Sequence, residues 1–135
     1  MELGAIRPAA TGVGLLIREL SPGDRDAVRD ALSASGAFSG EEIAVALELF
    51  DAGPEAGYWL LGAESEGRLL GYVCLGEAPL TQSSWYLYWL CVHPGGQGRG
   101  AGRALDSAAG AFAAARGGKR MVVETSGRPA YEKIG

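Results

Sequence analysis

The sequence is poor in cysteine, histidine and basic charge, and each shortage excludes a class of protein. Two cysteines among 135 residues do not make a disulfide framework. We expect Cys74 and Cys91, both in apolar runs, to be buried reduced thiols; a disulfide or a catalytic cysteine is the alternative. The single histidine, His93, has no neighbouring cluster of thiolates or carboxylates with which to bind a metal. The formal net charge of -4 argues against a nucleic-acid partner, because proteins that bind nucleic acid are usually basic.

Long apolar runs are missing as well. No run approaches the roughly 20 residues that a membrane span needs, and the N-terminus lacks the basic and then apolar segments of a secretory signal. We therefore expect a cytoplasmic protein with no membrane partner. The length and the composition, 47% hydrophobic and 21% charged, suit one domain over residues 14–135, preceded by a loose arm rich in Ala and Gly over residues 1–13.

Strand and helix patterns alternate along the chain and predict an α/β (α+β) fold with a mixed sheet and helices on its faces. Ser39 and Glu42 have the spacing of a capping box at the start of the second expected helix. The face of that helix expected to turn inward carries Ile43, Ala44, Leu47 and Phe50. The expected strands are 15–20, 58–64, 68–78, 85–92 and 119–126, and the expected helices are about 22–34, 40–51 and 101–115. The strand at 85–92 is almost wholly apolar, as expected of a central strand.

Glycine is concentrated in one place, between the strand at 85–92 and the helix that follows. Five of the eight residues from Gly95 to Gly102 are glycine, which costs conformational entropy on folding. Bare backbone at a helix N-terminus exposes N–H groups, which together with the helix dipole bind anions. Arg99 and Arg103 would add charge-assisted hydrogen bonds. The segment therefore predicts a phosphate or pyrophosphate site; a flexible linker is the alternative.

Two common phosphate-binding patterns do not match this segment. A P-loop needs Gly-Lys-Ser/Thr, and "GAGRAL" has neither the lysine nor the hydroxyl residue. The dinucleotide pattern G-x-G-x-x-G would need glycine at position 103 or 105, which are Arg103 and Leu105. The predicted phosphate site is therefore of another kind.

The pattern Q-x-x-G-x-G in "LCVHPGGQGRGAGRAL" resembles the acetyl-CoA-binding segment of the GNAT superfamily of N-acetyltransferases. The element order and "MVVETSGRPAYEKIG" are also similar to that superfamily, so the resemblance covers roughly residues 15–135. It implies a GNAT-like fold with a mostly antiparallel sheet, acetyl-CoA as cosubstrate and no metal. It also implies that the loop amides hold the pyrophosphate of coenzyme A, namely those of Gln97, Gly98, Arg99, Gly100, Ala101, Gly102 and Arg103. The preceding strand would pair its main chain, at Leu90, Cys91 and Val92, with the pantetheine arm, while the strand at 119–125 splays away.

The resemblance further implies direct attack of an amine on the thioester, which needs a base, N–H donors for the oxyanion and an acid for the leaving thiolate. The family's usual carboxylate position on the strand before the loop is occupied here by apolar and aromatic residues. Glu124 is then the best candidate base, with a structural carboxylate as the alternative, and Glu77 is a weaker one. Tyr131, in "YEKIG", resembles the tyrosine that protonates the coenzyme A thiolate in the family.

The spacing between these two residues departs from the family pattern. Only Thr125 to Ala130 separate Glu124 from Tyr131, where family members usually have a helix. The sequence also stops at Gly135, where the family continues into further strands. We therefore expect an internal segment near residues 131–132 and the C-terminal strands to be missing from the sequence.

Aromatic residues are dense in the second half of the sheet, at Tyr58, Trp59, Trp85, Tyr86, Tyr88 and Trp89. Most are expected in the core, and some could line an acceptor pocket in which a cation rests on an aromatic face. The resulting hypothesis is an acetyl-CoA-dependent N-acetyltransferase acting on a primary amine of a small molecule or peptide, with a homodimer left open. The alternative is a non-catalytic acyl-CoA-binding or interaction domain of the same fold.

Overall fold

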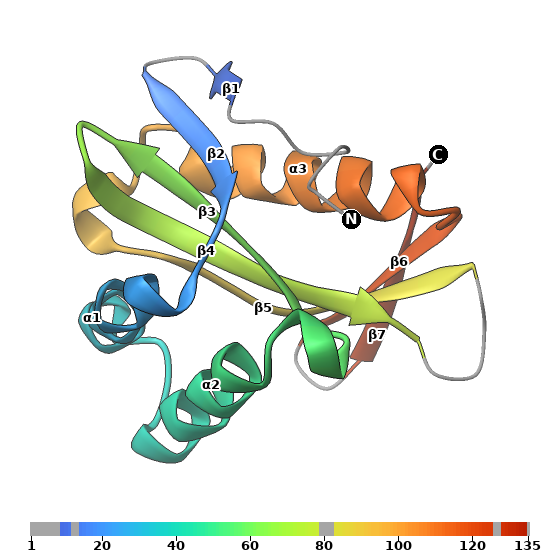
Figure 1. Ribbon diagram of the computed structural model, residues 1–135, viewed down its shortest axis with the longest axis horizontal. Helices are drawn as coiled ribbons and strands as arrows, with labels where there is room; N and C mark the ends of the chain where they lie inside the picture. Colours follow the sequence, from blue (N-terminus) through green and yellow to red (C-terminus); the bar gives the residue numbers. More distant parts are fainter. Residues whose placement is uncertain (1–8, 12–13, 79–82, 126–127, 135) are drawn as a thin grey trace.

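The computed structural model describes residues 9–11, 14–78, 83–125 and 128–134. These residues form one mixed sheet of seven strands in the order β1-β2-β3-β4-β5-β6-β7. Helices α1 and α2 lie on one face of the sheet and α3 lies on the other (Figure 1). The strands are Ala9–Thr11 (β1), Leu15–Glu19 (β2), Trp59–Ser65 (β3), Arg68–Glu77 (β4), Ser84–Val92 (β5), Arg120–Thr125 (β6) and Arg128–Lys133 (β7). The helices are Arg25–Ser35 (α1), Gly40–Ala52 (α2) and Ala101–Ala115 (α3), with short 3-10 turns at Pro22–Asp24, Pro54–Ala56 and Pro94–Gly96.

The predicted mixed fold is confirmed, and the structure adds β1 and β7 to the expected strands. All neighbouring strands pair antiparallel except β5 and β6, which pair parallel. A parallel pair needs a crossover connection, and α3 provides it. Three residues of the expected N-terminal arm, Ala9–Thr11, pair with β2 as β1.

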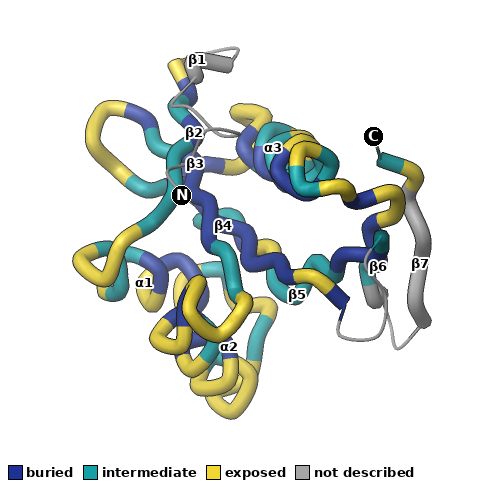
Figure 2. Tube along the Cα trace, turned by 45° about the vertical axis from the view of Figure 1, so that its right-hand side comes forward, coloured by how far each residue is buried: buried dark blue, intermediate teal, exposed yellow. Residues whose placement is uncertain are grey.

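The middle and most buried strand is β4, and β5, which the sequence predicts to be central, is the interior strand next to it, between β4 and β6. Residues 70–76 of β4 are all buried, and Figure 2 shows the strand as an almost continuous dark blue tube between the two helical layers. Strand β5 is half-buried from Tyr86 to Trp89 and exposed at Leu90. Strand β5 is apolar because helices cover both of its faces. Its edge on the side of β6 is open beyond Leu87, where the pairing with β6 ends.

The core on the α3 face is built around Phe112, which is fully buried. Its ring contacts Trp59 at a centroid distance of 5.3 Å and Trp85 at 6.1 Å. The buried residues of α3 are Ala101, Leu105, Ala109, Phe112 and Ala113. The three alanines among them let α3 approach β3, β4 and β5 closely, which fixes the position of the helix N-terminus relative to the end of β5.

The core on the other face packs α1 and α2 against Tyr72, Cys74 and Cys91. Its helical members are Val28, Ala31 and Leu32 from α1 and Ala46, Leu47 and Phe50 from α2. The predicted inward position of Ala44 is wrong, because Ala44 is exposed and Ala46 is buried in its place. The buried residues of α2 have helical spacing: Phe50 follows Ala46 by four residues and Leu47 by three. The predicted capping box is confirmed: Ser39 Oγ accepts from the Glu42 N–H at 3.1 Å, and Glu42 accepts from the Ser39 N–H at 2.8 Å.

Candidate functional site

The glycine loop starts directly after β5 and leads into α3 through backbone that only glycine adopts easily. Gly98 and Gly100 have φ angles of +80° and +81°, a region unfavourable for residues with a Cβ. A Cβ added at either position would meet no heavy atom within 4 Å, so the space in front of these residues is open. The loop therefore presents bare main chain to solvent.

The helix N-terminus supplies unpaired donors next to these glycines. Gly100 is the N-cap of α3, and no side chain caps it. The N–H groups of Ala101, Gly102 and Arg103 lie in the first helical turn, where an α-helix leaves its amides without intrahelical acceptors. The amide of Gln97, which the sequence analysis also counted as a pyrophosphate donor, instead donates to Pro94 O at 3.2 Å. The donors available for an anion are thus those from Gly98 onward.

The two arginines of the loop differ in their surroundings. Arg99 donates from Nη2 to Ser65 Oγ at 3.3 Å, which ties the loop to the turn between β3 and β4. Arg103 is exposed and has no ion-pair partner among the described residues. The two arginines give the segment from Gly95 to Arg103 its positive charge.

His93 anchors the start of the loop, a role that the sequence analysis did not assign. Its side-chain Nδ1 accepts a hydrogen bond from the Gly95 N–H at 2.9 Å, and its main-chain N–H donates to Leu70 O at 2.7 Å. Its Nε2 lies 3.4 Å from Asp30 Oδ2 of α1. Next to it Gly96 packs on Leu70, where a Cβ would approach to 2.8 Å. A single histidine before a glycine pair was the available signal for this anchor.

Strands β5 and β6 diverge halfway along β5. Their parallel register runs from Ser84–Arg120 to Leu87–Val123 and ends there. At the same level the register of β5 with β4 shifts, so that Tyr88 is an extra residue between the pairs Leu87–Leu75 and Trp89–Cys74. Such a bulge bends the strand, which accounts for the separation of β5 from β6. The predicted splay of the strand at 119–125 agrees with this register.

The open edge of β5 carries the main-chain groups of Leu90 and Val92. His93 donates its N–H toward β4, and successive residues of a strand direct their backbone groups to alternate sides. The main-chain groups of Cys91 therefore pair with Tyr72 of β4. Those of Leu90 and Val92 point to the opposite side, from which β6 has diverged. Of the three residues predicted to pair with the pantetheine arm, two have backbone groups on the open side.

Neither cysteine is placed to act as a nucleophile. Both are free thiols in the buried core, and Cys91 Sγ donates to Ala31 O at 3.3 Å. Burial raises the pKa of Cys74 to about 12 and also raises the pKa of Cys91. The expectation of buried reduced thiols is confirmed.

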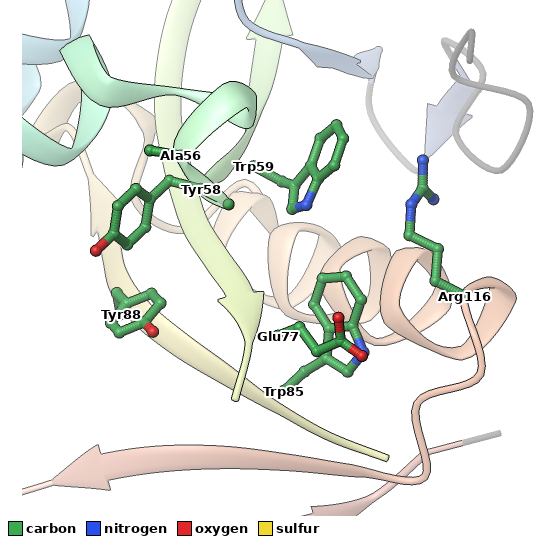
Figure 3. Close-up of a pocket in the computed structure, with 8 residues that line it drawn as sticks. Ala56, Tyr58, Trp59, Glu77, Trp85, Tyr88 and Arg116 are labelled. Atoms are coloured by element: carbon green, nitrogen blue, oxygen red, sulfur yellow. The ribbon is translucent and has the colours of Figure 1, made fainter. Parts of the chain in front are cut away.

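The structure places the backbone of the candidate base and acid but does not describe their side chains. Glu124 follows Val123, the last residue of β6 paired with β5, and its Cα partner in β7 is Pro129. Tyr131 lies in β7, with Val122 as its partner. The weaker candidate base, Glu77, is exposed at the end of β4, on the rim of a cavity lined by aromatic residues (Figure 3).

The described part of the chain has no helix with the length and apolar character that crossing a membrane requires. The same residues contain no group of three or more His, Cys, Asp or Glu side chains that could hold a metal ion.

Comparison with known proteins gives one consistent family. The model of the acetyltransferase (GNAT) family matches residues 25–135. Among solved structures, a GNAT-family protein from Desulfovibrio desulfuricans is 34% identical with a TM-score of 0.78, and the match covers 82% of this chain and 73% of that one. No curated protein matches the chain.

Two more distant structures share the fold. A GNAT family acetyltransferase from Brucella melitensis in complex with acetyl-CoA is 24% identical with a TM-score of 0.69, over 83% of this chain and 76% of that one. The ribosomal-protein-S18-alanine N-acetyltransferase from Escherichia coli is 21% identical with a TM-score of 0.67, over 82% of this chain and 66% of that one.

Proposed function

Because the chain belongs to the acetyltransferase (GNAT) family, we propose that it is an N-acetyltransferase that moves the acetyl group of acetyl-CoA to a primary amine. The observation that carries the proposal is the juxtaposition of two features. The bare glycine backbone at the N-terminus of α3 adjoins the edge of β5 that β6 leaves open. One extended ligand with a phosphorylated end and an amide-bearing arm fits both.

The loop fits the phosphate end of coenzyme A. The N–H groups from Gly98 to Arg103 and the positive end of the α3 dipole bind the pyrophosphate, and the open space at Gly98 and Gly100 lets a bulky anion approach the main chain. Arg103 contributes its charge. In the Brucella relative the bound ligand is acetyl-CoA, which supports the same ligand here.

The open edge of β5 fits the arm. Leu90 and Val92 pair their main-chain groups with the amides of the pantetheine, as a peptide strand would add to a sheet edge. The divergence of β5 and β6 next to Tyr88 makes room for the thioester. A backbone N–H on this edge is positioned to stabilise the oxyanion that forms at the thioester carbonyl.

Acetyl-CoA supplies a thioester whose carbonyl carbon is attacked by the amine nitrogen, after which the C–S bond breaks, the sulfur takes a proton and the nitrogen loses one. We assign Glu124 as the base that removes the proton from the amine and Tyr131 as the acid. Both assignments rest on the resemblance to the family and on the backbone positions of the two residues at and beside the end of the β5–β6 pairing. The chain's buried thiols take no part, so no acetyl-enzyme forms.

The test is release of free thiol from acetyl-CoA in the presence of a panel of amines, with the N-acetyl product identified by mass. We expect thiol release in proportion to product and a loss of roughly 100-fold or more in kcat for Glu124→Gln, with unchanged coenzyme A affinity. Glu48→Gln, which neutralises an exposed carboxylate of α2, is the matched control and should keep its kcat. Coenzyme A binding without thiol release from any amine would favour the non-catalytic acyl-CoA-binding domain.

A further inference from the structure

The cavity with Glu77 on its rim has a volume of about 540 Å3 and lies at the far end of α3 from the glycine loop. Because α3 has 15 residues, its two ends are separated by about 22 Å. The cavity forms where β3 begins, β4 ends, β5 begins and α3 ends (Figure 3). It is lined by Ala56, Gly57, Tyr58, Trp59, Glu77, Trp85, Tyr88 and Arg116. Apart from Tyr88, next to which the thioester is proposed to lie, none of these residues takes part in the proposed binding of coenzyme A.

Arg116 is the cationic wall of this cavity, and its guanidinium forms no ion pair with any of the described carboxylates. Its guanidinium carbon lies 3.7 Å from the ring centroid of Phe112 and 5.1 Å from that of Trp59. Its Nη1 is buried and has no hydrogen-bond partner within the part of the chain that the structure describes, and burial lowers its pKa. Glu19 attracts it electrostatically without forming an ion pair within 4 Å, and Glu19 Oε2 is also buried without a partner among the same residues.

Two other arginines of the chain form the ion pairs with carboxylates that Arg116 lacks. Arg18 pairs with Asp24 at 2.9 Å and with Glu64 at 2.7 Å. Arg25 pairs with Asp51 at 2.8 Å. A half-buried guanidinium on aromatic rings that lacks such a carboxylate is complementary to a carboxylate brought by a ligand.

A second unpartnered donor lies beside Arg116. Trp85 is 3% exposed, and its Nε1–H has no hydrogen-bond partner among residues 9–11, 14–78, 83–125 and 128–134. The nitrogen edge of the indole faces the turn that follows α3, because a Cβ placed at Gly118 would lie 3.1 Å from Nε1. The end of α3 thus gathers two buried donors without acceptors, where buried polar groups are normally paired.

The opposite wall of the cavity reaches the point at which β5 and β6 separate. Tyr88, the extra residue of the β5 bulge, lines the cavity and packs edge-on against Tyr58 at a centroid distance of 5.4 Å. The cavity therefore extends from the cation at Arg116, past the indoles of Trp59 and Trp85, to the strand position at which the thioester is proposed to lie.

We propose that this cavity binds the acceptor and that the acceptor is an amine bearing a carboxylate. Arg116 takes the carboxylate, the rings of Trp59 and Trp85 hold an apolar body between the two charged ends, and the amine is directed toward Tyr88. The assignment of the ligand as acceptor rests on the proposed acetyl transfer, whereas the carboxylate site stands on Arg116 and the cavity alone.

The test compares two probes of similar shape, 4-(aminomethyl)benzoate and 4-(aminomethyl)benzamide, in which a charged carboxylate is replaced by a neutral carboxamide. Binding to the full chain saturated with coenzyme A is followed by calorimetry and by quenching of tryptophan fluorescence, and transfer by thiol release from acetyl-CoA. We expect the benzoate to bind roughly tenfold or more tightly than the benzamide, as a charge-assisted hydrogen bond predicts. Arg116→Met should remove this preference by weakening the benzoate alone, and Arg116→Lys should keep part of it.

Arg25→Met, which removes an arginine from the surface of α1, is the matched control and should leave both probes unchanged. Equal affinity of the two probes for the wild-type protein, or a preference that survives in Arg116→Met, would overturn the carboxylate site. If the benzoate binds through Arg116 and no thiol is released, the site stands and the acetyl transfer fails. If amines are acetylated without regard to a carboxylate, the transfer stands and the site fails. Coenzyme A affinity and the thermal midpoint of each variant show that the fold is retained.

Discussion

His93 Nδ1 accepts the N–H of Gly95 at 2.9 Å, so the side chain of the one histidine in the chain holds the first glycine of the loop. The main-chain N–H of His93 donates a hydrogen bond to Leu70 O at 2.7 Å. The start of the glycine loop is therefore fixed at the end of β5. The glycines that follow have no side chains that could fix the rest of the loop. A bare loop binds an anion well only when its amides are already oriented, because ordering them on binding costs affinity.

His93→Ala should weaken coenzyme A binding by roughly fivefold, the worth of one hydrogen bond of about 1 kcal/mol. His93→Asn is the matched control, because an Asn side-chain oxygen accepts from the N–H two residues later and should restore most of the affinity. Calorimetric titration with coenzyme A measures both. Equal affinities for the wild type and the alanine variant would show that the loop does not depend on this anchor.

Gly100→Ala and Gly117→Ala form a second matched pair. Their φ angles are +81° and +88°, and an added Cβ would meet no heavy atom within 4 Å at either position. Each substitution should therefore destabilise the fold by a similar amount, about 1–2 kcal/mol for an alanine in this region. Only Gly100→Ala places its Cβ in front of the proposed pyrophosphate site, and it should weaken coenzyme A by tenfold or more.

Thermal midpoints and coenzyme A titrations of the two glycine variants separate strain from binding. A Gly117→Ala variant that loses as much coenzyme A affinity as Gly100→Ala would mean that loss of stability, and not a blocked site, accounts for both.

Most elements of the fold could be predicted because local signals and tertiary packing agree. Ser39 and Glu42 mark the start of α2 and make both bonds of the capping box, and the apolar steps of α3 are those that bury Leu105 and Phe112. The central position of β4 was missed because it depends on which strands lie on either side. Gly71 and Gly76 are the clue within β4, since a Cβ at either would come within 2.5 Å of a carbonyl oxygen, of Cys91 and Gly57 respectively.

The loop was predicted residue by residue, whereas the sequence suggested an aromatic acceptor pocket without indicating Arg116 or the bulge at Tyr88. The donors of the loop are consecutive in sequence, so their spacing is visible before folding. The bulge at Tyr88 lies in a run of apolar and aromatic residues that has no alternation to interrupt, so no residue marks it. Arg116 looked like an ordinary last-turn arginine, and its lack of a carboxylate partner depends on residues brought together from four elements.

Arg103→Ala should weaken coenzyme A by roughly tenfold and leave pantetheine almost unaffected, because a charge-assisted bond to a phosphate is lost and pantetheine has none. Arg99→Ala should have a smaller effect on coenzyme A, since part of the hydrogen-bonding capacity of Arg99 is used on Ser65 at 3.3 Å. Lys119→Ala, an exposed cation beyond the other end of α3, is the control for net charge and should change neither ligand. Competition binding with coenzyme A and pantetheine measures the three variants. Equal losses for both ligands in Arg103→Ala would place this arginine away from the phosphates.

The two cysteines should be dispensable for acetyl transfer. Cys74 and Cys91 are 1% and 3% exposed, and their raised pKa values keep them as thiols at neutral pH. Cys74→Ala and Cys91→Ala should therefore retain turnover apart from small packing losses. An acetyl adduct on the protein that vanishes in Cys91→Ala would indicate a covalent route instead of direct transfer.

The same burial predicts how stability responds to alkali. The pKa of Cys74 rises from 9.0 to about 12 on folding, so between these values the folded protein keeps a proton that the unfolded chain has lost. The free energy of unfolding should then fall as pH rises above 9, by up to about 1.4 kcal/mol per pH unit for this one group. Urea unfolding of Cys74→Ala between pH 8 and 11 should give a shallower fall than the wild type, whatever the difference in stability at pH 8. The buried thiol of Cys91 and the buried phenol of Tyr72, whose pKa values are raised from 9.0 and 10.0, should leave a residual slope in this variant. Identical slopes for the two proteins would mean that the Cys74 thiol is open to water in solution, and the close packing of α1 and α2 on β4 would then be wrong.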